Sequence, residues 1–160
     1  MASRAELRPA TAGDEAFLLT VYASTREQEL AVVPWDAATK DAFVRMQFAA
    51  QHGYYRERFP GATFDVVMVN GEPAGRLYVD RRDTEIWIID VALLPSHRGR
   101  GIGTALLTPI LEEAERTGKT VSIHVERTNP ARRLYRRLGF VEVAEQGVHL
   151  LFTRQVKIAS

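Results

Sequence analysis

Apolar residues recur along this chain with two different periods, and each period predicts one type of element. Short runs of β-branched and aromatic residues predict strands at positions 7–10, 64–69, 75–80, 85–94, 121–126, 140–143 and 148–153. Helical spacing predicts helices after Thr11, over 37–58, from the glycines near position 101 to Gly118, and from Asn129 to Gly139. The three strands between 64 and 94 are predicted to form an antiparallel meander.

Polar and glycine residues mark where these elements begin and turn. Thr11 followed by Asp14 resembles a capping pair that opens the first helix, and Asp36 is placed to cap the second. Asn70-Gly71 is a strong hairpin signal between two strands. In the second helix, the spacing predicts an inner stripe of Phe43, Met46 and Ala50.

Length and charge narrow the class of protein. The chain has 160 residues, of which 46% are hydrophobic, so we expect residues 1–160 to form a single domain. Its 21 basic and 20 acidic residues nearly cancel, which argues against nucleic acid or an anionic membrane as a partner. No apolar run approaches membrane-spanning length, and we expect a cytoplasmic protein.

The absence of cysteine excludes several chemistries at once. Without cysteine the chain forms no disulfide, no thiolate zinc site and no covalent acyl-cysteine, so any acyl transfer is expected to be direct. The histidines show no metal-ligand spacing, and we expect no metal. They are His52, His97, His124 and His149.

A glycine loop between the strand at 85–94 and the following helix is the main candidate for binding phosphate. Glycines leave backbone amides uncovered, and the first turn of a helix adds unpaired N–H groups. The dinucleotide pattern fails here, because Thr104 or Leu106 stands where it requires glycine. The Walker pattern also fails, because Glu113 stands where its first glycine belongs.

The loop instead matches Arg-x-x-Gly-x-Gly, with Arg98, Gly101 and Gly103 in the defined positions. This is the pyrophosphate signature of the GNAT superfamily of acyl-CoA-dependent N-acetyltransferases, which the chain resembles from about residue 64 to 154. Residues 129–140 resemble the second signature of that family, Asn-x-x-Ala-x-x-Leu-Tyr-x-x-x-Gly-Phe. The resemblance implies an α/β (α+β) fold: a mixed, mostly antiparallel sheet of about seven strands, splayed between strands 4 and 5 and flanked by about four helices.

The resemblance also implies acetyl-CoA as co-substrate and a set of residues that bind it. The loop amides are expected to contact the pyrophosphate; they belong to Arg98, Gly99, Arg100, Gly101, Ile102, Gly103 and Thr104. The backbone at the end of the preceding strand is expected to pair with the pantetheine arm; it comprises Val91, Ala92 and Leu93. Asn129 is expected near the cofactor, although helix capping alone explains it, and Arg132 or Arg133 is a candidate for the 3′-phosphate.

Acetylation of an amine requires a group that removes its proton. A lysine-like amine has a pKa of about 10.4, so only on the order of one molecule in a thousand is nucleophilic near neutral pH. Asp90 and Glu85 are the carboxylates best placed to act as the base, and strand alternation predicts that they lie on opposite faces. We prefer Asp90; a purely structural role in the sheet is the alternative, and Glu126 and His124 are held in reserve.

Tyr135 is the strongest catalytic candidate. A phenol can donate a hydrogen bond or a proton to a departing thiolate, and the matching tyrosine of the family has that role. Its position in the helix also fits a buried, purely packing side chain. The second signature favours the catalytic role.

The acceptor amine is the least determined feature. The segment 27–35 and its surroundings are expected to line the acceptor site, with candidates Arg26, Glu29, Trp35 and Tyr55. Amino acids, polyamines, aminoglycosides and protein amino termini all remain open as acceptors. The leading hypothesis is acetylation of a small amine; the alternatives are a protein lysine or amino-terminal acetyltransferase and a non-catalytic acyl-CoA sensor. A homodimer is compatible with the resemblance.

Overall fold

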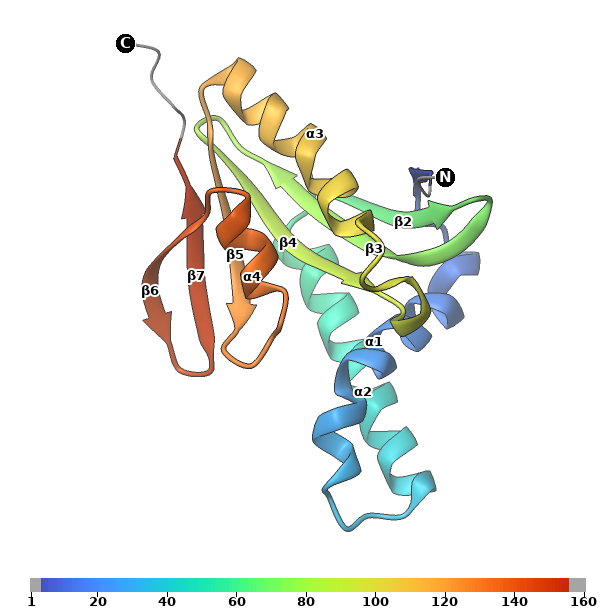
Figure 1. Cartoon of the computed structure of the whole chain (residues 1–160). Coiled ribbons are helices and arrows are strands. Elements are labelled where there is room, and N and C mark those ends of the chain that lie inside the picture. The colour runs from blue at the N-terminus through green and yellow to red at the C-terminus, as the bar shows by residue number, and fades with distance from the viewer. Residues whose placement is uncertain (1–3, 156–160) are drawn as a thin grey trace.

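The computed structural model describes residues 4–155 and contains one seven-stranded sheet with helices on both faces (Figure 1). The helices are α1 Glu15–Ala31, α2 Ala37–Arg58, α3 Ile102–Thr117 and α4 Arg132–Arg137, with short 3₁₀ turns at Ala12–Asp14 and Pro95–His97. The strands are β1 Ala5–Pro9, β2 Thr63–Val69, β3 Glu72–Arg81, β4 Glu85–Leu93, β5 Thr120–Glu126, β6 Val141–Gln146 and β7 His149–Arg154. The predicted order of elements is confirmed.

The strand order in the sheet is β1-β2-β3-β4-β5-β7-β6, and every neighbouring pair is antiparallel except β4 with β5. That parallel pair is short: it begins at Glu85 opposite Thr120 and ends at Ile88 opposite Ile123. Beyond it the two strands separate, and β5, β7 and β6 diverge from β4 (Figure 1). The mixed, splayed sheet expected from the resemblance is therefore confirmed.

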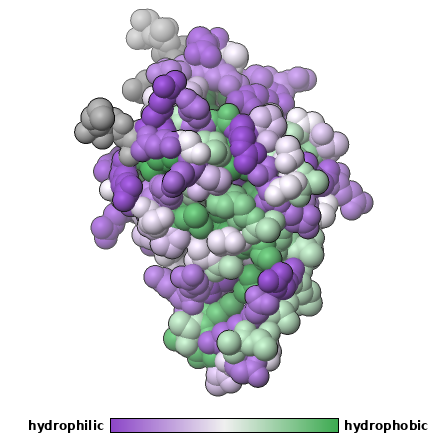
Figure 2. All heavy atoms as spheres, turned by 90° about the vertical axis from the view of Figure 1, so that its right-hand side faces the viewer, coloured by the Kyte–Doolittle hydropathy of each residue, from purple (hydrophilic) through white to green (hydrophobic). Residues whose placement is uncertain are grey.

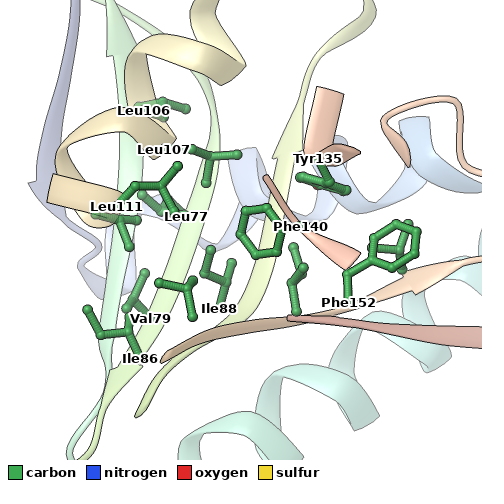
Figure 3. Close-up of a cluster of buried hydrophobic side chains, with 14 of the residues drawn as sticks. Leu77, Val79, Ile86, Ile88, Leu106, Leu107, Leu111, Tyr135, Phe140 and Phe152 are labelled. Carbon is green, nitrogen blue, oxygen red and sulfur yellow. The ribbon is translucent and has the colours of Figure 1, made fainter. Parts of the chain in front are cut away.

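Two clusters of buried side chains hold the layers together. The larger lies between the sheet and helices α3 and α4, and it includes Ile86, Ile88, Leu107 and Phe152 (Figure 3). The smaller lies between β2 and the pair α1 and α2. The apolar stripe predicted for the helix after the glycine loop is buried in the larger cluster; it consists of Ile102, Leu106, Ile110 and Ala114.

The inner stripe predicted for α2 is wrong. The buried side chains of α2 are Val44 and Phe48, whereas Met46 is 61% exposed. Phe48 packs edge-on against Tyr22 of α1 with ring centroids 6.1 Å apart, so the covered face of α2 is the one turned to α1. Apolar side chains on its other faces reach the surface in the lower part of the molecule, where the α1–α2 hairpin lies (Figure 2). Hydrophobic spacing alone had no means of choosing between these faces, because α2 carries apolar residues on more than one.

The capping predictions are confirmed by hydrogen bonds. The Asp36 carboxylate accepts the Thr39 N–H at 2.7 Å at the start of α2. Before α1, the Asp14 carboxylate accepts the Thr11 N–H at 2.7 Å and both terminal nitrogens of Arg8 at 2.7 and 2.8 Å. The Arg8 guanidinium and the Thr11 amide hold the pKa of Asp14 well below its usual range. The carboxylate thus ties β1 to the first helical turn.

Asp14→Asn is expected to lower the free energy of unfolding at pH 7 by about 1 kcal/mol, the typical contribution of a capping carboxylate. Because the folded-state pKa of Asp14 is lowered, its contribution is complete above the unfolded pKa of about 3.9 and declines as the pH falls below it. Urea unfolding at pH 7 and pH 3 measures both effects. Asp41→Asn is the control: it breaks an exposed pair with Arg45 at 2.8 Å and should cost less than about 0.5 kcal/mol. Equal losses in the two variants would contradict the prediction.

Candidate active site

The open side of β4 forms one wall of a gap in the sheet. After Ile88 the strand continues to Leu93 without a partner on β5, while its other edge stays paired with β3, Leu77 lying opposite Val91 and Arg76 opposite Ala92. The backbone groups on the free edge between Ile89 and Leu93 are available to an extended ligand, apart from the Leu93 carbonyl, which accepts a hydrogen bond from Arg98. The segment Val91 to Leu93, predicted to bind pantetheine, lies on this edge.

A bulge in β4 overturns the expectation that Glu85 and Asp90 lie on opposite faces. Tyr78 lies opposite Asp90 and Val79 lies opposite Ile88, so Ile89 is an extra residue without a counterpart on β3. This extra residue cancels one alternation. Both carboxylates consequently lie on the face turned away from the core cluster that holds Ile88.

Asp90 is held by a buried arginine of the neighbouring strand. Its carboxylate pairs with Arg76, a side chain of which only 3% is exposed. The same guanidinium donates to Gln51 of α2 at 3.1 Å and lies 5.2 Å from the centre of the Tyr78 ring and 5.8 Å from that of Tyr22. Asp90 therefore neutralises a buried charge, which favours a structural role for this carboxylate over that of a base.

Glu85 lies at the closed end of the gap, where β4 and β5 are still paired. Its carboxylate accepts the Ser122 hydroxyl at 2.7 Å and forms an ion pair with Arg82 at 3.3 Å. The structure brings Asp90 to the open part of the gap but leaves Glu85 outside it.

Tyr135 approaches the gap from α4. Its side chain is 3% exposed, and its ring packs edge-on against Phe140 at 5.8 Å and Phe152 at 6.3 Å (Figure 3). Burial, with the nearby charge of Asp90, raises the pKa of the Tyr135 phenol above its usual range. The phenol therefore stays protonated and remains a hydrogen-bond donor at any physiological pH. Tyr135 and Asp90 lie close enough to interact electrostatically although they come from α4 and β4.

The glycine loop is built around two left-handed residues. Gly99 has a φ of 73° and Gly101 a φ of 76°, and a side chain added at either would meet open space. Gly101 caps α3, and the first backbone bond of this helix runs from the Ala105 N–H to the Gly101 carbonyl at 3.1 Å. The amides of the first helical turn precede that bond and are free for an anion. The Arg98 Nε donates to the Leu93 carbonyl at 3.0 Å and fastens the loop to the end of β4.

The two sequence signatures touch each other. A Cβ on Gly103 would lie 2.9 Å from a methyl carbon of Leu134, so glycine lets the first turn of α3 approach α4 closely. At the start of the second signature, the Asn129 Oδ1 accepts the Ala131 N–H at 2.9 Å. The prediction that Asn129 caps the following helix is wrong, because α4 begins at Arg132 with Ala131 at its N-cap position, and Asn129 instead holds the turn before the helix. A surface hollow of about 470 Å³ opens beside it, lined by Thr128, Asn129, Pro130, Arg132, Arg133 and Arg136. Its three guanidinium groups favour an anionic ligand.

The acceptor residues predicted from the sequence separate into two groups. Arg26 of α1 pairs with Glu29 at 3.0 Å and with Glu126 of β5 at 3.1 Å, so it joins α1 to the far wall of the gap. Tyr55 packs against Tyr78, and burial with the charge of Asp90 raises the pKa of its phenol. Trp35 instead packs against Phe43 at 5.2 Å in the α1–α2 hairpin, apart from these residues.

Sequence reasoning missed Arg76 as a site residue. The only available signal was a charged residue inside an otherwise apolar strand, and its partner lies on another strand. Within residues 4–155 no helix is long and apolar enough to cross a membrane, and no group of three or more potential metal ligands is assembled.

Comparison with known proteins agrees with this architecture. The profile described as "Acetyltransferase (GNAT) family" matches residues 23–140, more than half of the chain. The chain has no close match among curated proteins.

Several solved structures share the fold. The PaiA N-acetyltransferase from Thermoplasma acidophilum, in complex with coenzyme A, has a TM-score of 0.71 at 15% identity over 95% of this chain and 99% of that one. A protein described as histone acetyltransferase HPA2 and related acetyltransferase, from Corynebacterium glutamicum, has a TM-score of 0.69 at 21% identity over 100% and 99%. An acetyltransferase from Thermus thermophilus has a TM-score of 0.67 at 20% identity over 95% and 97%.

Proposed function

The chain belongs to the GNAT family of acetyltransferases, and on this premise we propose that it transfers an acetyl group from acetyl-CoA to the primary amine of a small molecule. In this proposal residues 1–160 act as a single domain in the cytoplasm, and the amine attacks the thioester directly in a ternary complex. The observation that supports this proposal most strongly is the gap between β4 and β5, with the glycine loop at its open end. The chain contains no cysteine that could form a covalent acyl-enzyme intermediate.

The proposed cofactor site uses three features of the gap. The amides between Arg98 and Thr104 receive the pyrophosphate, and the free edge of β4 pairs with the pantetheine arm. The hollow with Arg132 and Asn129 receives the 3′-phosphate end of the nucleotide. The Thermoplasma protein of the same fold holds coenzyme A, which supports this assignment.

The proposed role of Tyr135 is to stabilise the departing thiolate. A thiol has a pKa of about 8.5, below the ordinary phenol value of about 10, so complete proton transfer from phenol to thiolate is uphill. Burial raises the pKa of Tyr135 further. We therefore assign Tyr135 a hydrogen bond to the sulfur as the C–S bond breaks, with the final proton supplied from water.

A release assay for the free thiol of CoA tests the proposed function. The panel comprises spermidine, lysine, kanamycin and a peptide with a free amino terminus, and calorimetry measures acetyl-CoA binding in parallel. Release with one of the first three supports the proposal. Release with the peptide alone would identify a protein acetyltransferase, and tight binding without any release would identify a sensor.

Gly101→Glu is expected to weaken acetyl-CoA binding at least about 100-fold, because it places a negative charge beside the phosphates and removes their contacts with the loop. Gly118→Glu is the matched control: this glycine ends α3, has a φ of 70° against 76° for Gly101, and also faces open space. Both variants carry the same charge and similar backbone strain, so thermal unfolding should show similar losses. Calorimetry should show weak binding in the first variant only. Equal affinities would contradict the assignment of the loop.

A further inference from the structure

His124 lies where the two halves of the sheet begin to separate. Ile123 is the last residue of β5 that pairs with β4, its partner being Ile88, so His124 is the first residue of β5 beyond the paired part, at the start of the gap. Ile123 belongs to the core cluster, whereas His124 is exposed on the opposite face, the face that also carries Asp90.

Two aromatic neighbours fix the imidazole. The Trp87 ring meets it edge-on at 4.8 Å from β4, and the His149 ring lies 6.4 Å away on β7. No hydrogen bond to a ring nitrogen of His124 is seen among residues 4–155, so these nitrogens are free for a substrate. Partial desolvation of the ring, with the nearby His149, lowers the pKa of His124 below its ordinary value. The imidazole is therefore neutral, and able to accept a proton, near pH 7.

The carboxylates near the gap are engaged elsewhere. Asp90 neutralises Arg76, Glu126 pairs with Arg26 at 3.1 Å, and Glu85 lies at the closed end. The groups that surround His124 are His149 on β7, Ser122 and Glu126 on β5, and Trp87 on β4, whose ring lies 5.7 Å from the Arg82 guanidinium. Among the side chains named in this paragraph, His124 is the one that has both an accessible basic nitrogen and a position beside the gap.

We propose that His124 is the base that removes the proton of the acceptor amine. This inference rests on the proposed function and deepens it. The ammonium group gives one proton to His124, which passes it to water, and the neutral nitrogen forms the C–N bond with the acetyl carbon. The nitrogen then loses its second proton as the C–S bond breaks and its electron pair moves to sulfur. The net reaction converts an ammonium ion and acetyl-CoA into the acetamide, CoA thiol and one proton.

The pH dependence follows from the state that His124 needs. Only the neutral imidazole accepts a proton, and the lowered pKa keeps it neutral down to below the ordinary value of about 6.5. The kcat/KM of the wild type should stay high near neutral pH and fall as the pH drops through the pKa of His124. A variant without this base should instead gain activity as rising pH deprotonates the amine in solution.

The test compares two nucleophiles in wild type and in His124→Gln. With the best amine of the panel, which is protonated at pH 7, the variant should lose about 100-fold in kcat/KM and lose the acid limb of the profile. With hydroxylamine, which is largely unprotonated at pH 7, no base is needed, and the variant should stay within about threefold of wild type. A purely structural loss would lower both rates equally. His52→Gln is the control, since His52 stacks on Phe48 at 5.3 Å within α2 and its pKa is also lowered.

The outcomes separate this inference from the proposed function. If wild type binds no acetyl-CoA and acetylates neither nucleophile, the proposed function fails and the inference with it. If wild type is active but His124→Gln keeps the full rate and the acid limb with the protonated amine, only the role of His124 is overturned. Equal losses with both nucleophiles would likewise reject it. Calorimetry with acetyl-CoA should give the same affinity for wild type and variant.

Discussion

Tyr135→Phe is expected to lower turnover about 100-fold while acetyl-CoA binds within about twofold of wild type. The substitution removes only the hydroxyl, which in the proposed mechanism donates to the sulfur when negative charge develops there. Because the ring packs against Phe140 and Phe152, phenylalanine preserves the packing and the variant should unfold at the same temperature. Steady-state kinetics, calorimetry and thermal unfolding measure the three quantities.

Tyr54→Phe supplies the comparison for that result. Tyr54 is 58% exposed on α2, so the loss of its hydroxyl should change neither turnover nor stability. Should Tyr135→Phe lose affinity and turnover by the same factor, Tyr135 would be a binding or packing residue and its assignment to the leaving group would be wrong.

Asp90→Asn is expected to lower the free energy of unfolding by about 3 kcal/mol, because it leaves the guanidinium of Arg76 without its counter-charge in the protein interior. Arg76 is 3% exposed, and its other side-chain hydrogen bond among residues 4–155 is with the neutral amide of Gln51. Urea denaturation at pH 7 measures the loss. Asp80→Asn on the neighbouring strand is the control, since Asp80 pairs at 3.0 Å with an arginine that is 42% exposed, and it should cost less than about 1 kcal/mol.

A double variant sharpens the test of the buried pair. Arg76→Met together with Asp90→Asn removes both charges, so its loss should be smaller than the sum of the two single losses. Additive losses would show that the two charges do not depend on each other, and the account of Asp90 as the counter-ion of Arg76 would have to be abandoned.

Local sequence signals predicted the order of the helices and strands in this molecule. The features that they did not predict depend on which residues of neighbouring strands pair. Asp36 and Asn70-Gly71 identify a helix start and a hairpin because the interactions involved span only a few residues. The bulge at Ile89 gives no such signal: positions 88 and 89 are both isoleucine, and the extra residue becomes visible only through the pairing with β3. Strand alternation therefore placed Glu85 and Asp90 incorrectly.

The candidate site divides in the same way. The loop with Gly101 and the helix with Tyr135 were found because each carries a recognisable spacing of residues. The engagement of Asp90 by Arg76 was not found, since it depends on which residues of two strands face each other. The same limit explains the order of the candidates for the base. From the sequence Asp90 is preferred to His124, whereas the neighbours of the two residues in the structure favour His124.

The short parallel contact between β4 and β5 has a mechanical consequence. Within residues 4–155, the two halves of the sheet are paired through four residues of each strand, Glu85 to Ile88 with Thr120 to Ile123, and the Thr120 N–H also donates to the Thr84 carbonyl at 3.2 Å. A ligand that lies along the free edge of β4 would stabilise the contact between the two halves of the sheet. The empty protein is expected to open most easily there, and amide hydrogen exchange along β5 should slow when the cofactor binds.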